Sequence, residues 1–158
     1  MIAVDSTILI HAHRADSPFH AAAAPRLIEL ASAGEPWAIP WPSVHEYLTV
    51  ATSRRIFIKP SHAEMALAFI QALMDSPTLT LIGETHLHWS ELQTLVVGSG
   101  VAGARIHEAR IAAICLEHGV SELWSADRDY GRFPALKVVN PLVAGYGGAI
   151  SVRAPSML

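Results

Sequence analysis

The chain has 158 residues, of which 51% are hydrophobic and 16% are charged, and its formal net charge is −3. This length and composition predict one folded domain with a sizeable core and exclude a disordered chain. The negative charge excludes a globally basic nucleic-acid-binding protein, so any phosphate-binding surface has to be local.

The cysteine content and the hydropathy pattern narrow the class further. The single cysteine, Cys115, excludes an intrachain disulfide and a cysteine-rich zinc site, and its apolar surroundings predict a core residue. The opening apolar run is interrupted by Asp5, and no apolar stretch reaches the roughly 20 residues that span a bilayer. We therefore expect a cytoplasmic protein with no membrane contact.

Short apolar runs alternate with longer helical patterns along the whole chain. Expected strands cover residues 1–4, 37–40, 78–82, 122–125 and 137–139. Expected helices cover residues 6–14, 21–33, 43–53, 60–72, 86–96 and 104–118. The alternation predicts an α/β fold in three layers, with a mainly parallel central sheet and helices on both faces. We expect this domain to span residues 1–142, followed by a tail at 143–158 that is rich in Gly and Ala.

Acidic residues stand where the expected strands end. Asp5, Glu46, Asp127 and Asp129 each lie just past a strand or in the helix that follows it, and Glu108 lies early in the helix before the fourth strand. Ligands collect at the carboxyl ends of parallel strands, and converging carboxylates repel one another unless a cation neutralises them. Oxygen ligands without a Cys or His cluster favour Mg²⁺ or Mn²⁺, which suits hydrolysis of a phosphodiester.

Each acid except one also has a purely structural interpretation. Asp5 can cap the helix that follows it, Glu46 can favour the positive end of its helix, and Asp127 or Asp129 can cap a turn. Glu108 lies inside its helix and caps nothing evident. The spacing alone leaves both interpretations open.

Three segments, MIAVDSTILI, WPSVHEYLTVATS and HEARIAAICLEHGVSELWSADRDYGRFPALKVVNPL, resemble PIN domains of the VapC toxin family. Together they reach from residue 1 to residue 142. The resemblance implies a PIN-like fold and a metal-dependent endoribonuclease, the toxin of a type II toxin–antitoxin module. Carried over by position, the catalytic and metal-binding acids are Asp5, Glu46, Glu108 and Asp127. Asp129 is implied as an auxiliary metal ligand, with Ser6 and Ser125 in support.

The resemblance also implies the cofactor and the partners. These are Mg²⁺ or Mn²⁺, an RNA substrate of the tRNA or rRNA class, a VapB-type antitoxin and a second copy of the chain in a homodimer. Candidate RNA contacts are the arginines near the acids: Arg105, Arg110, Arg128 and Arg132. The competing interpretation is that most of them are solvated or paired with acids. The four tryptophans are interpreted as core or interface residues, not as surfaces for base stacking.

Two other functions stay open at this point. The family usually has aspartate at the position of Glu108, so the chain can also be a weakened PIN-like module that binds antitoxin or RNA without cleavage. That module would bind Mn²⁺ weakly and would not arrest growth. The run Asp5-Ser6-Thr7 after a strand suggests a haloacid-dehalogenase-type phosphohydrolase. However, that class needs a second aspartate where Thr7 stands, so we rank it lower.

Overall fold

The computed structural model describes residues 1–143. Of the tail predicted at residues 143–158, all but Val143 therefore lies outside the described residues. Within residues 1–143 no helix is long and apolar enough to cross a membrane.

A five-stranded parallel sheet forms the middle of the domain, as the alternating pattern predicted. The strands stand in the order β3-β2-β1-β4-β5. They are β1 (Ile2–Val4), β2 (Trp37–Pro40), β3 (Leu79–Ile82), β4 (Glu122–Trp124) and β5 (Val138–Val139). All four residues of β2 are buried, because helices cover both faces of a parallel sheet.

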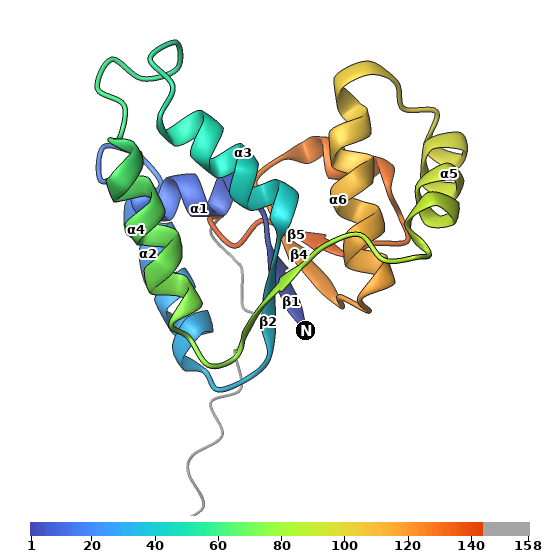
Figure 1. The fold of residues 1–158 in the computed structure, drawn as a ribbon, viewed down its shortest axis with the longest axis horizontal. Helices are drawn as coiled ribbons and strands as arrows, with labels where there is room; N and C mark the ends of the chain where they lie inside the picture. The colour runs from blue at the N-terminus through green and yellow to red at the C-terminus, as the bar shows by residue number, and fades with distance from the viewer. Residues whose placement is uncertain (144–158) are drawn as a thin grey trace, which may run out of the picture.

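The helices divide between the two faces of the sheet (Figure 1). On one face, the core is shared by α1 (Ser6–His13), α2 (His20–Ser32), α3 (Trp41–Ala51) and α4 (Ala63–Met74). On the other face, α5 (His88–Ser99) and α6 (Ile106–Glu117) pack over a second core that contains Cys115. A short 3₁₀ helix, η1 (Gly103–Arg105), precedes α6, and a second, η2 (Arg128–Arg132), follows β4. The three-layer architecture predicted from the sequence is confirmed.

Abrupt strand-to-helix junctions place polar side chains at the carboxyl edge of the sheet. Strand β1 ends at Val4 and α1 begins at Ser6, so only Asp5 separates them. Strand β2 runs directly into α3, where Pro42 lies in the first turn and its missing N–H is not needed. Because β1 lies between β2 and β4, these two junctions and the end of β4 are neighbours.

Candidate active site

Asp5 is buried at the carboxyl edge of the sheet and is surrounded by hydroxyl groups. It is only 2% exposed, and its side chain makes no capping hydrogen bond to α1. Its Oδ2 accepts hydrogen bonds from Ser125 Oγ at 2.8 Å and Thr7 Oγ1 at 3.1 Å. Its Oδ1 accepts from Tyr130 OH at 3.2 Å and Ser43 Oγ at 3.4 Å. Burial raises the pKa of Asp5, while the hydrogen bond from Ser125 acts in the opposite direction.

Glu46 lies on α3, and the other predicted acids affect the pKa of its carboxyl group. Its Oε2 accepts a 2.8 Å hydrogen bond from Ser6 Oγ at the start of α1. Partial removal of its carboxyl from water raises the pKa of Glu46, and the negative charges of Asp5, Glu108 and Asp127 raise it further. The Ser6 hydrogen bond opposes these effects. The four acids that the family resemblance assigned to the site therefore interact electrostatically in the folded chain.

Glu108 carries a buried oxygen that has no partner. It stands in the first turn of α6, and its Oε2 is buried and accepts no hydrogen bond within the described part of the chain. An unsatisfied buried acceptor costs free energy, more so when it is charged. Such an atom is typical of a side chain whose ligand is missing, since a helix-forming role alone does not require a buried carboxylate oxygen.

Asp127 and Asp129 differ in their surroundings. Asp127 Oδ1 accepts a 2.8 Å hydrogen bond from the backbone N–H of Asp129, so Asp127 does cap η2, as its structural interpretation predicted. Its charge still reaches Glu46. Asp129 lies 3.5 Å from Arg105 Nε and 3.8 Å from Arg132 Nε, and its auxiliary metal role stays a prediction.

The four candidate arginines lie around these acids, and three of them form ion pairs. Arg105 and Arg132 pair with Asp129, and Arg110 pairs with Glu84. Arg128 lies exposed on η2. Pairing with acids, the competing interpretation, thus holds for three of the four, and the pairs leave the side chains partly exposed.

A cleft of about 410 Å³ runs between α3 and α6 beside the acids. Its walls include Glu46 from α3 and Glu108 from α6, together with Arg110. The other lining residues are Pro42, His45, Thr49, Ala104, His107 and Ile111. Sequence reasoning missed the two histidines, although each stands directly before one of the predicted acids. It also missed the hydroxyls of Ser43 and Tyr130, which no local sequence pattern connects with Asp5.

The donor set suits a hard divalent cation, although the acids do not yet form a closed set of ligands. Within residues 1–143 no group of three or more His, Cys, Asp or Glu side chains is arranged as it stands to hold a metal ion. The side chains at hand nevertheless offer carboxylate oxygens, which Mg²⁺ and Mn²⁺ prefer. Their mutual repulsion at Glu46 and the unpartnered Glu108 Oε2 are what a cation would relieve. The residues therefore fit such an ion.

The PIN domain family model matches residues 2–136, a span that contains every acid described above. Ribonuclease VapC43 of Mycobacterium tuberculosis is 33% identical over 142 residues, which cover 90% of this chain and 96% of that protein. The chain belongs to the PIN-domain family, among its VapC ribonucleases. Membership makes it a toxin ribonuclease of a toxin–antitoxin module, as the sequence resemblance implied, and does not support the phosphohydrolase alternative.

Solved structures of VapC proteins share its fold. The crystal structure of Mycobacterium tuberculosis VapC20, described as a sarcin-ricin loop cleaving toxin, has a TM-score of 0.61 at 17% identity and covers 83% of this chain and 93% of its own. VapBC2 from Rickettsia felis, bound to a DNA fragment from its promoter, has a TM-score of 0.61 at 18% identity and covers 89% of this chain and 98% of its own. The PIN-like fold class is thereby confirmed.

Proposed function

We propose that this VapC ribonuclease hydrolyses RNA phosphodiesters at a Mg²⁺ or Mn²⁺ site formed by Asp5, Glu46, Glu108 and Asp127. The observation that carries the proposal is the electrostatic coupling of four carboxylates from distant chain segments, one of which has a buried oxygen without a partner. Converging carboxylates repel one another and destabilise the folded chain unless a cation neutralises them. Asp129 is assigned an auxiliary role at the rim.

The residues around the proposed metal site orient the carboxylates that would bind the cation. A bound divalent cation lowers the pKa of water and neutralises charge on the phosphate oxygens. Ser125, Thr7 and Tyr130 hold the Asp5 carboxylate in one orientation, and Ser6 does the same for Glu46. These hydroxyl donors restrict the orientations of the Asp5 and Glu46 carboxylates, so less conformational freedom is lost when a cation binds.

Arginine side chains near the cleft provide local positive charge for RNA phosphates, although the net charge of the protein is negative. Arg110 lines the cleft together with Glu108, and its side chain stays partly exposed beside its ion pair with Glu84. Arg105, Arg128 and Arg132 stand at the rim near Asp129. Guanidinium groups bind phosphates in a bidentate manner, so we assign Arg110 to the RNA backbone and the other three to more distant phosphates.

The proposed partners follow from the family. We assign the chain a VapB-type antitoxin, since its structural neighbour from Rickettsia felis is a VapBC protein. A homodimer and an RNA substrate of the tRNA or rRNA class complete the proposal, and VapC20 of Mycobacterium tuberculosis acts on the sarcin-ricin loop. Such substrates place the activity in the cytoplasm.

Mn²⁺ binding and RNA cleavage, measured on the same partner-free protein, test this function. Glu46→Gln and Asp127→Asn are expected to weaken Mn²⁺ binding and to lower cleavage together. Glu64→Gln, which alters an exposed glutamate at the start of α4, serves as the matched control and should change neither. Weak Mn²⁺ binding by the unaltered chain without cleavage, and no growth arrest on its expression, would instead favour the binding module that does not cleave.

A further inference from the structure

We propose that Trp41 and His45 form a stacking surface for an unpaired RNA base at the mouth of the cleft between α3 and α6. The inference rests on the proposed function, because it names how that site holds its substrate. It concerns two residues that are not among the carboxylates proposed to bind the metal ion. It gives Trp41 a different role from the core or interface role expected of all four tryptophans.

The two rings lie on one side of α3. Trp41, His45 and Thr49 are spaced four residues apart, which places them one above another on a helix. The ring centroids of Trp41 and His45 are 6.0 Å apart at an interplanar angle of 35°. His45 and Thr49 line the cleft, and the Trp41 ring lies next to His45 on the same side of α3, so we infer that it continues this wall. Glu46 follows His45 in the sequence and lines the same cleft, so this wall continues to the acidic residues.

Exposure separates Trp41 from the tryptophans of the core. Trp37 and Trp124 are 0% exposed, whereas Trp41 is 43% exposed and Trp89, on α5, is 69% exposed. An exposed aromatic ring loses the stabilisation that burial would give it. The exposed Trp41 ring lies beside His45, a residue of the cleft wall, where a ring face can receive a base.

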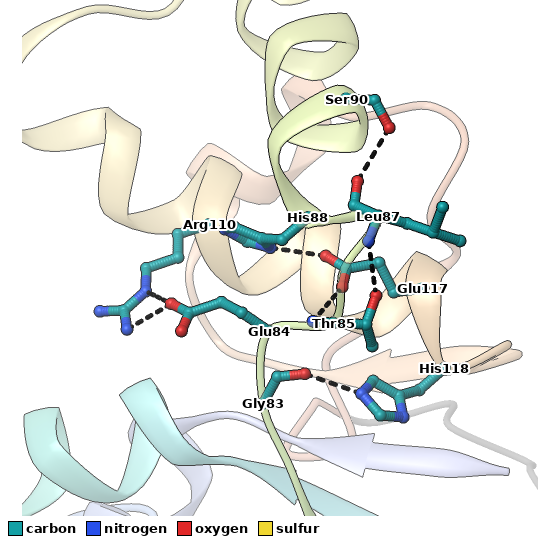
Figure 2. A network of polar contacts seen from close by, with 9 residues as sticks. All are labelled: Gly83, Glu84, Thr85, Leu87, His88, Ser90, Arg110, Glu117 and His118. Carbon is teal, nitrogen blue, oxygen red and sulfur yellow. Dashed lines mark hydrogen bonds and ion pairs between the residues drawn. The ribbon is translucent and has the colours of Figure 1, made fainter.

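The opposite wall presents cationic and polar groups to the same space. His107 and Arg110 lie one turn apart on α6 and both line the cleft. Glu84 holds the Arg110 guanidinium through Nε and Nη2 (Figure 2). A nucleotide in this cleft would meet aromatic rings on one side. On the other side it would meet Arg110, a hydrogen-bond donor for its phosphate. The volume of about 410 Å³ falls within the ordinary range for small-ligand sites.

The loop between β3 and α5 carries Glu84 and passes beside Trp41. Glu117 of α6 accepts from the Thr85 backbone N–H at 2.8 Å and contacts His88, while His118 contacts the Gly83 carbonyl at 2.8 Å (Figure 2). At Gly83, a Cβ would lie 3.5 Å from the Trp41 ring, so the loop passes directly beside the indole. The Trp41 ring therefore packs against this loop at the position of Gly83.

Base stacking on aromatic side chains is tolerant of sequence and strong enough to matter here. Replacement of a stacking aromatic by alanine typically weakens single-stranded binding by about 5- to 150-fold. Recognition of RNA by proteins concentrates on loops whose unpaired bases can be splayed out and stacked. Stacking also adds affinity that does not depend on positive charge, which a chain with a net charge of −3 lacks overall.

Tryptophan fluorescence with a short single-stranded RNA in EDTA tests the proposal without requiring cleavage. In Trp89→Phe, Trp41 is the one exposed tryptophan within residues 1–143, so RNA should quench the emission as in the unaltered protein. In Trp41→Phe the quenching should be lost. A fully paired RNA stem should quench neither. Retained quenching in Trp41→Phe, or its loss in Trp89→Phe alone, would overturn the proposal.

Affinity and cleavage measurements separate the stacking surface from the active site. Trp41→Ala and His45→Ala should each raise the Kd for single-stranded RNA about tenfold and raise KM for cleavage with little change in kcat. Trp89→Ala is the matched control and should leave both constants unchanged. If both cleft variants keep the original Kd and KM, the stacking surface is wrong although the nuclease stands. If the unaltered protein quenches with RNA but never cleaves it, the proposed function fails and stacking survives.

Discussion

Ser125 Oγ donates a 2.8 Å hydrogen bond to Asp5 Oδ2, and this contact joins the ends of β4 and β1 across 120 residues of sequence. The same Ser125 oxygen accepts from the Asp127 backbone N–H at 3.0 Å. The Ser125 hydroxyl thus orients the Asp5 carboxylate and also positions the backbone of Asp127.

Ser125→Ala should raise the Mn²⁺ concentration needed for half-maximal cleavage by about 10- to 100-fold, the usual cost of losing a residue that orients a metal ligand. The Ser125 hydroxyl opposes the effect of burial on Asp5, so its loss should raise the pKa of that carboxyl further and weaken its preference for a cation. A Mn²⁺ titration of RNA cleavage measures this. An unchanged Mn²⁺ requirement would show that the hydrogen bond does not support the site.

Asp5→Asn should make the metal-free protein more stable while it abolishes cleavage. Asp5 is 2% exposed and burial raises its pKa, so the charged form is disfavoured in the folded chain. We expect the Tm in EDTA to rise by about 2–4 °C, which corresponds to about 1 kcal/mol in a chain of this size. Mn²⁺, which should raise the Tm of the unaltered protein, should no longer do so in the variant. A lower Tm in EDTA would contradict this account of Asp5.

Glu108 is expected to need its charge more than its exact length. Glu108→Gln should lower single-turnover cleavage at saturating Mn²⁺ by about 10²–10³-fold, because the buried Oε2 then lacks the charge that a cation requires. Glu108→Asp restores the residue usual in the family and should keep the rate within about tenfold. A Gln variant as fast as the original chain would remove Glu108 from the site. A large gain in Glu108→Asp would mean that the glutamate weakens the natural enzyme.

The contacts of Glu117 with Thr85 and His88 should make the free energy of unfolding sensitive to acid. Burial raises the pKa of Glu117, but hydrogen bonds from Thr85 and His88 outweigh it and hold the pKa below its usual 4.5. A lowered folded-state pKa contributes stability that is complete above the unfolded value and is lost as pH falls through the folded value. Glu117→Gln should therefore cost about 1–3 kcal/mol in urea unfolding near neutral pH.

The difference between Glu117→Gln and the original chain should shrink as the pH is lowered below about 4.5. Glu64→Gln, at an exposed position, serves as the control and should show no such convergence. A penalty that is equal at neutral and acidic pH would mean that Glu117 acts through packing and not through its charge.

The sequence carried enough information to predict the layers and the strand ends, because hydropathy periodicity follows directly from burial. Asp5 and Glu46 could be assigned to one sheet edge, since the ends of neighbouring parallel strands must meet there. Ser43 and Tyr130 could not be connected with Asp5, because contacts across 38 and 125 residues depend on how α3 and η2 pack. The exposure of Trp41 could not be predicted from the sequence, because it depends on how the loop between β3 and α5 packs beside α3.

RNA cleavage by EDTA-treated, partner-free protein, before and after Mg²⁺ or Mn²⁺ is added, tests the central claim most directly when Asp5→Ala is assayed in parallel. The account predicts no cleavage in EDTA, cleavage by the original chain once either cation is added, and a loss of at least about 100-fold in Asp5→Ala. Cleavage that persists in EDTA, or that Asp5→Ala retains at the original rate, would contradict a metal-dependent site built around Asp5.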